Sequence, residues 1–428
     1  MPKTSSQYMT IGDLIKKYRC DSHLTQVQVQ SMSGVTTASI SRIESGETRH
    51  SDFKTIKAIA NGLNIPFDLY IPLYIENENR PDSLLAILQE AIQVSAPIAI
   101  TTHIATKFLE SPLDDSIDLT EKLYKTTATM TDPSIQLMLY NTIIHHSREH
   151  GIMTYMAKGM YQQYMIERND FSKLLLTYQS GRNILHYVNF LSDDESIVFH
   201  YSLGVHALSL MLYEESIELS AFAERNDAGR NKWNATKNLF LCTYHLQRFD
   251  ESKHYLEKYK KLKDTQIDND AIMFEAMLSK YTESTAAALE KLNSYLERSS
   301  QYNLVYVVSE LVDIYLQIDD LSAAVELLKY EEDMVESLKD KRATPDKRAR
   351  LAYFYRIVGK AFLHQNTERA FDYYLKSAAA YMQIGLHEKA LESVSYIHDA
   401  IIEDSSRFST DILVKINALY AKAMNKAY

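Results

Sequence analysis

Glycine and proline are scarce in this chain, which has 11 glycines and 8 prolines among 428 residues. In average proteins these two residue types make up roughly 12 % of the sequence and supply much of the special turn geometry. Their scarcity therefore favours long, uninterrupted helices. It disfavours β-sandwiches, β-barrels and disordered chains.

Cysteine is almost absent as well, because only Cys20 and Cys242 occur. Two cysteines cannot build a disulfide framework or, alone, a structural zinc site, so we expect a reducing compartment. The N-terminus has no apolar signal core, and no apolar run approaches the roughly 18 residues of a membrane span. The sequence thus predicts a cytoplasmic protein without a membrane partner.

Charge is unevenly distributed along the chain. The net charge is −10, but residues 1–75 carry eight Lys or Arg against six Asp or Glu, which leaves this part at +2. The overall balance argues against a chain that is coated with nucleic acid throughout. We expect the two parts to have different roles.

Residues 10–72 contain four short amphipathic segments, which predict four helices around one small core. Thr25 and Asp52 stand where helix N-caps are expected, and Gly34 and Gly46 follow predicted helix ends, where a left-handed residue is favoured. The segments are 11–19, 25–32, 36–45 and 52–63.

This region resembles the lambda-repressor-like (Xre-type) helix-turn-helix family over about 60 residues. Gln30 departs from the pattern because the family prefers alanine there, which predicts slightly looser packing of two helices. The matching residues are Thr25-Gln26, Val29, Gly34-Val35-Thr36, Ile40-Ser41, Ile43-Glu44-Ser45-Gly46, Ile56, Ile59-Ala60 and Leu63.

A helix that begins with short polar residues can enter the DNA major groove while its apolar face rests on the domain. Arg42 can form a bidentate contact to guanine, Ala38 can meet a thymine methyl group, and Gln26 at a helix N-terminus can hold a phosphate. The small positive charge predicts weak binding by a monomer and hence a homodimer on paired half-sites. The predicted DNA-binding residues are Gln26, Thr36, Thr37, Ala38, Ser39 and Arg42.

A turn motif recurs through the rest of the chain, consisting of an aromatic or apolar residue, one or two polar residues and a small or apolar residue. Its small positions are separated by 34 to 46 residues, which brackets the 34-residue period of tetratricopeptide (TPR) repeats. The copies are at 171–174, 213–216, 249–252, 321–324 and 367–370, with a weaker one that ends at Ala286.

The segment also resembles the TPR family in Leu203-Gly204 before Tyr213 and in Leu311 and Tyr315 before Leu321. We expect about six helical hairpins over 151–402 and less regular pairs at 84–150. The predicted fold class is all-α, with a helix-turn-helix domain at 1–72, a linker at 73–83 and a right-handed TPR-like α-solenoid at 84–428 for peptide binding and dimerisation. The first helix of each hairpin should line its concave face.

Polar residues at inward positions of these hairpins suggest a peptide groove. Asn234 and Asn238 lie one helical turn apart, and each amide offers the donor and the acceptor that a peptide backbone needs. The alternative is ordinary surface polarity, in which the charges are simply solvated. The predicted peptide-binding residues are Tyr201, Asn234, Lys237, Asn238, Tyr244, Glu310, Asp313 and Arg356, with Tyr306 and Lys360 nearby.

Metal and catalytic motifs are weak. His146 and His150 have i, i+4 spacing, but the zincin glutamate after the first histidine is missing and no third ligand is indicated. A glycine-rich phosphate loop, a nucleophile elbow and a Cys-His pairing are not found. We therefore expect no enzyme activity and no cofactor.

The order of a helix-turn-helix and a long TPR array resembles the RRNPP family of peptide-pheromone receptors, by length the NprR-like branch or arbitrium-type receptors. The resemblance implies a cytoplasmic, homodimeric transcription regulator that binds a double-stranded DNA operator and a short signalling peptide. In one alternative, the array sequesters another protein such as a response regulator, which peptide releases. In a second, the chain is a TPR scaffold with vestigial DNA binding.

Overall fold

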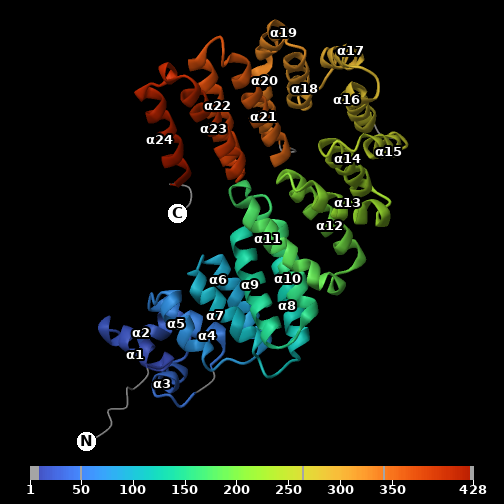
Figure 1. The fold of residues 1–428 in the computed structure, drawn as a ribbon. Coiled ribbons are helices and arrows are strands. Elements are labelled where there is room, and N and C mark those ends of the chain that lie inside the picture. Colours follow the sequence, from blue (N-terminus) through green and yellow to red (C-terminus); the bar gives the residue numbers. More distant parts are fainter. Residues whose placement is uncertain (1–8, 49–50, 263–264, 341–342, 425–428) are drawn as a thin grey trace, which may run out of the picture. The chain divides into compact units, whose positions relative to one another are not determined.

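The computed structural model describes residues 9–48, 51–262, 265–340 and 343–424, and these form helices and no strand. The all-α fold class is therefore confirmed. The chain divides into two compact units, Met1–Ile166 and Glu167–Tyr428 (Figure 1). None of the helices in the described ranges has the length and apolar character needed to span a bilayer.

Unit 1 contains ten helices in the described residues, the last of which ends one residue into unit 2. They are α1 (Ile11–Asp21), α2 (Gln26–Ser33), α3 (Thr37–Glu44), α4 (Phe53–Gly62), α5 (Phe67–Ile75), α6 (Pro81–Gln93), α7 (Ile98–Leu109), α8 (Ser116–Ala128), α9 (Pro133–Glu149) and α10 (Met153–Glu167).

The first four helices begin and end within two residues of the predicted positions. The side chain of Thr25 accepts a hydrogen bond from the backbone of Gln28 at the start of α2, and Asp52 accepts one from Thr55 at the start of α4. Gly34 is left-handed after α2, with φ of 74°. The predicted caps are confirmed, and apolar residues from all four helices form the core. These include Leu14, Val29, Ile40, Ile43, Ile56 and Ile59.

The expected linker at 73–83 lies inside unit 1. Helix α5 continues to Ile75 and α6 begins at Pro81, while one apolar core extends from Leu14 in α1 to Ile143 in α9. The polar groups of this segment are satisfied internally, around Glu78. The ranges 1–72 and 84–428 stay predictions for the functional domains.

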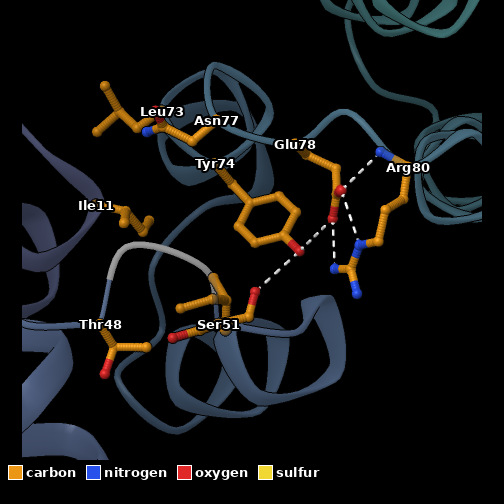
Figure 2. Close-up of a pocket in the computed structure, with 9 residues that line it drawn as sticks. Ile11, Thr48, Ser51, Leu73, Tyr74, Asn77, Glu78 and Arg80 are labelled. Atoms are coloured by element: carbon orange, nitrogen blue, oxygen red, sulfur yellow. Dashed lines mark hydrogen bonds and ion pairs between the residues drawn. The ribbon is translucent and has the colours of Figure 1, made fainter. Parts of the chain in front are cut away.

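Glu78 is 6 % exposed and accepts hydrogen bonds from several neighbours (Figure 2). The Tyr74 hydroxyl lies 3.0 Å from Glu78 Oε2 and 3.1 Å from the Ser51 carbonyl oxygen. Arg80 donates from its backbone N at 2.9 Å and from Nη2 at 2.8 Å, and Ser83 Oγ donates at 2.8 Å. Burial alone raises the pKa of Glu78, but these hydrogen bonds hold it at about 2. The cluster ties the start of α6 to the segment that precedes α4.

Unit 2 contains α11 to α24 and five short 3-10 helices in its described residues. They are η1 (Phe171–Lys173), α11 (Leu174–Ile184), η2 (Leu185–Phe190), α12 (Asp193–Ser209), α13 (Tyr213–Asn226), α14 (Arg230–His245), α15 (Phe249–Lys260), α16 (Thr265–Thr282), α17 (Thr285–Leu296), α18 (Leu304–Gln317), α19 (Leu321–Glu326), η3 (Leu327–Tyr330), α20 (Glu331–Glu336), η4 (Ser337–Lys339), α21 (Pro345–Phe362), α22 (Thr367–Gln383), α23 (His387–Glu403), η5 (Ser405–Arg407) and α24 (Thr410–Met424).

The recurring turn motif marks the start of the second helix in four hairpins, namely α13, α15, α19 and α22. Two residues before three of these helices the backbone is left-handed at a residue other than glycine. This geometry costs more for a residue with a Cβ than for glycine. Several hairpins therefore turn without glycine, in keeping with its scarcity in the chain. The three residues are Met211 (φ 61°), Gln247 (φ 59°) and Asp319 (φ 60°).

Close helix pairing in unit 2 depends on two glycines. A Cβ on Gly204 in α12 would lie 2.7 Å from Ser220 Oγ, and one on Gly359 in α21 would lie 2.7 Å from Tyr374 Cδ1. In both hairpins the glycine backbone lies close to a side chain of the paired helix. An alanine at either position would force that side chain or helix to shift. Helix α12 also contacts α21, far along the chain, so the array curves back on itself within unit 2 (Figure 1).

We predict that Glu78→Gln lowers the free energy of unfolding of unit 1 by about 1–3 kcal/mol at neutral pH, because it removes a buried charge that four groups hydrogen-bond. The folded pKa of about 2 lies below the ordinary value of 4.5. The stabilisation is therefore present above that ordinary value and is lost as the pH falls towards about 2. Denaturant unfolding at neutral and acid pH measures this difference.

The matched control is Glu47→Gln, which alters an exposed glutamate of the same unit and should change stability by less than about 0.5 kcal/mol. Equal losses in the two variants, or a Glu78→Gln loss that grows as the pH falls, would contradict the prediction.

Candidate functional site

Helix α3 presents a short polar face on unit 1. Ile40 and Ile43 are buried against the domain, whereas Thr36, Ala38 and Arg42 are exposed. Thr36 caps the helix, since its Oγ1 accepts a hydrogen bond from the Ser39 backbone at 3.3 Å. The predicted face therefore exists, and Thr37 and Ser39 lie half-buried at its edge.

Arg42 projects from the last turn of α3. Its Nε donates to the Ala38 carbonyl oxygen at 3.3 Å, and no ion pair engages its guanidinium in the described part of the chain. The terminal nitrogens, which would make a bidentate contact to guanine, are thus not used in a salt bridge. The role of Arg42 in DNA binding stays a prediction.

Gln26 is held inside the domain by Glu44. Its Nε2 donates to Glu44 Oε2 at 2.9 Å, and Arg19 forms two hydrogen bonds to the same carboxylate, at 2.7 and 2.8 Å. Burial opposes the charge on Glu44, but these hydrogen bonds lower its pKa below the ordinary value. One of the two Nε2 hydrogens of Gln26 is therefore used within the domain, and its role as a phosphate contact stays a prediction.

Gln30 contacts the start of α3. Its Oε1 accepts a hydrogen bond from the Thr37 backbone N at 3.0 Å. The sequence predicts looser packing here, because only the missing alanine is visible in the pattern. The structure adds a polar contact between α2 and α3 that this reasoning missed.

Three cavities follow one another along the inner side of unit 2. The Asn238 cavity has a volume of about 380 Å³, the Arg350 cavity about 480 Å³ and the Lys360 cavity about 690 Å³. Asp346 lines the first two, and Asp313, Tyr353 and Arg356 line the last two. Shared lining residues make the three cavities neighbours, and together we call them the channel; they are lined largely by the first helices α12, α14, α18 and α21.

All eight predicted peptide-binding residues line this channel, so the structure brings them together, although their role in binding stays a prediction. Four of them line the Asn238 cavity, namely Tyr201, Asn234, Lys237 and Asn238. The other four line the Arg350 cavity, namely Tyr244, Glu310, Asp313 and Arg356.

The predicted charges are paired rather than free. Lys237 Nζ lies 2.8 Å from Asp270 Oδ2, and Arg356 Nη1 lies 2.7 Å from Glu392 Oε1. The channel therefore has no acidic zone separate from a basic one. Counted together, six basic and six acidic side chains line the three cavities, so the lining is electrically balanced.

A buried ion pair lines the Arg350 cavity. Arg350 Nη2 is paired with Glu310 Oε2, and the Tyr244 hydroxyl donates to Glu310 Oε1 at 2.7 Å. The side chains of Arg350 and Glu310 are 14 % and 5 % exposed. Glu310 is thus held from two sides and can present little of its charge to a ligand.

Asn238 differs from these groups. It is 7 % exposed, lines the channel, and its Nδ2 has no hydrogen-bond partner among the described residues. Leaving a buried donor unpaired costs about 1–3 kcal/mol. Asn234, one turn earlier, is half-buried.

Sequence reasoning missed three residues of the Arg350 cavity, namely Asp346, Arg350 and Tyr381. Burial raises the pKa of Asp346, although the Tyr306 hydroxyl at 3.1 Å opposes this. Burial, together with Arg350, lowers the pKa of His245 to about 3. The buried Tyr381 hydroxyl has no partner in the described ranges. Asp346 and Arg350 could have been found by extending the helical spacing back from Lys360 and Arg356.

The weak metal pattern forms a histidine stack. The His146 and His150 rings are 4.0 Å apart, and His146 Nε2 lies 2.9 Å from Ser116 Oγ. Burial lowers the pKa of His146 to about 4. Across the described residues, no group of three or more His, Cys, Asp or Glu side chains is arranged to hold a metal ion.

Comparison with known proteins identifies the N-terminal fold. Residues 15–70 match the helix-turn-helix family. This region is a helix-turn-helix domain, and it contains α2 and α3 together with the exposed face described above. No curated protein sequence matches the chain.

Solved structures resemble the chain at low sequence identity. A STAND protein with a tetratricopeptide repeat sensor from Pyrococcus horikoshii is 13 % identical, with a TM-score of 0.43, over 92 % of this chain and 63 % of that one. A Rap protein complexed with Competence and Sporulation Factor is 12 % identical, with a TM-score of 0.39, over 77 % of this chain and 100 % of that one. Apo NprR from B. thuringiensis is 12 % identical, with a TM-score of 0.34, over 75 % of this chain and 97 % of that one.

We predict that Arg350→Met lowers the free energy of unfolding of unit 2 by about 3–5 kcal/mol, because it leaves the buried Glu310 without its cation. The control is Arg248→Met, which breaks the ion pair between Arg248 and Glu214. The side chain of Arg248 is 41 % exposed and that of Glu214 is 58 % exposed. That loss should stay below about 1 kcal/mol. Thermal and denaturant unfolding compare the two, and losses of similar size would contradict the burial argument.

Proposed function

We propose that this protein is a DNA-binding transcriptional regulator whose unit 2 channel binds a short peptide, and that the peptide alters DNA binding or oligomeric state. The helix-turn-helix domain supports the DNA-binding half of the proposal. The cavities of unit 2 support the peptide half. We further propose that the protein is cytoplasmic and non-catalytic and that it acts as a homodimer on paired half-sites, as expected for an RRNPP-type regulator.

The observation that carries the peptide proposal is the unpaired Nδ2 of Asn238 in the channel wall. A peptide carbonyl oxygen is the acceptor that such a donor lacks. Aromatic side chains around it, including Trp233 and Tyr201, offer apolar surface together with polar edges. The balanced charge of the lining suits a neutral, zwitterionic chain better than a polyanion such as a nucleotide.

The DNA half rests on the exposed face of α3. Its N-terminal residues are short and polar, and Ile40 and Ile43 hold it against the domain. This is the geometry with which a recognition helix enters the major groove. Arg42, whose guanidinium forms no described salt bridge, is the group best suited to read a guanine.

We predict that Arg42→Ala weakens specific DNA binding by roughly 1–3 kcal/mol per half-site without unfolding the protein. The probe is a set of duplexes selected by the full chain from a random-sequence library, titrated at fixed salt. Lys17→Ala is the control, because it removes one exposed charge from α1. Unchanged affinity of Arg42→Ala for the selected duplexes would overturn this assignment.

We predict that Asn238→Ala weakens peptide binding by roughly 1–3 kcal/mol and leaves the fold at least as stable, because alanine is the better helix former. The probe is a peptide that the full chain retains from a random seven-residue library, resynthesised and measured by calorimetry. Asn234→Ala should weaken binding in the same direction.

Asn417→Ala is the matched control, since Asn417 is an exposed asparagine inside α24 that lines none of the three cavities. It should leave peptide affinity unchanged. If the wild-type chain retains no peptide, the peptide half of the proposal fails. If Asn238→Ala binds as tightly as the wild-type chain, the assigned contact is wrong.

A further inference from the structure

Gln30 lies in α2, yet its side chain reaches the first residue of α3. Its Oε1 accepts a hydrogen bond from the Thr37 backbone N at 3.0 Å. Gln30 itself is exposed, as are its neighbours Ser31 and Met32. An exposed glutamine gains little from burial, so the hydrogen bond to α3 is what orders this side chain.

The bond satisfies a backbone group that the helix cannot satisfy itself. The first N–H groups of a helix have no partner within it. Thr36 Oγ1 serves the N–H of Ser39, and Gln30 Oε1 serves that of Thr37. The N-terminus of α3 therefore has acceptors from its own cap and from α2.

The same bond sets the direction of the glutamine amide. A carboxamide is planar and carries one acceptor oxygen and one nitrogen with two donor hydrogens. Because the oxygen faces a backbone N–H, the assignment of oxygen and nitrogen is fixed by the contact. Within the described residues, the Nε2 of Gln30 has no hydrogen-bond partner, whereas the Nε2 of Gln26 is bound to Glu44.

We propose that Gln30 contacts DNA. Its Nε2 would donate to an acceptor atom of the duplex next to the predicted contact of Thr37. This inference rests on the proposed DNA-binding function and adds a contact residue from α2 to those of α3. The acceptor is a base-edge atom in the major groove or a phosphate oxygen, since both accept from an amide N–H. The bond to Thr37 holds the donor in place before DNA arrives, which reduces the entropy lost on binding.

The test compares Gln30→Ala and Gln30→Glu in the full chain, with duplexes that the wild-type chain selects from a random-sequence library. Gln30→Ala removes both the cap and the donor. Gln30→Glu keeps the acceptor for Thr37 and removes the donor. Gln28→Glu adds the same charge to an exposed position of α2 whose Oε1 already accepts from Thr25, so it measures the effect of charge alone.

We expect Gln30→Ala to weaken binding roughly 3- to 10-fold for each copy of Gln30 in the complex. Gln30→Glu should weaken binding at least as much while it keeps the wild-type melting temperature, and Gln28→Glu should weaken it less. A loss confined to one base pair of the selected site identifies a base contact. An equal loss on selected and random duplexes identifies a phosphate contact.

Unchanged or improved affinity of Gln30→Ala would overturn the inference and leave Gln30 as a helix cap only. The inference would also be overturned by two results together. In these, Gln28→Glu and Gln30→Glu lose the same DNA affinity, and Gln30→Ala binds DNA as the wild-type chain does. If the wild-type chain selects no duplex, the proposed DNA-binding function itself fails, so the two failures are distinguishable.

Discussion

A buried polar group must find a partner, and this requirement determines which parts of the molecule are closed and which are open to a ligand. Glu78 in unit 1 and Glu310 in unit 2 are both nearly inaccessible, and each is surrounded by donors. Such groups fix neighbouring helices relative to one another. Asn238 and Tyr381 differ, because each faces the channel with a buried polar atom that has no partner among the described residues. The Nδ2 of Asn238 is the atom on which the proposed peptide contact rests.

Local sequence patterns predicted the elements that are determined locally. The caps at Thr25 and Asp52 depend on side chains three residues from the groups they bind, and both are confirmed. The repeated turn motif predicted where second helices begin, because an aromatic or apolar residue followed by polar ones suits the first turn of a helix that packs on its predecessor. The inward register of α14 also placed Asn234 and Asn238 in one cavity.

The features that sequence reasoning missed depend on pairs of residues far apart in the chain. Nothing in the local pattern at 73–83 reveals that Tyr74, Arg80 and Ser83 converge on Glu78. Glu310 was predicted to face a peptide, but its partner Arg350 lies 40 residues further along the chain. Gln30 was read as a packing defect because its partner is a backbone N–H, which carries no signature in a sequence.

The contact between α12 and α21 gives the channel a mechanical property. A repeat array with free ends can absorb a rotation at one hairpin by swinging its remainder aside, because each repeat contacts only its neighbours. In unit 2 the hairpins between α12 and α21 form a loop whose two ends touch. A rotation at any joint must then be compensated at the other joints or at the touching ends. A displacement at one wall is therefore shared by the other joints of the loop and does not stay local.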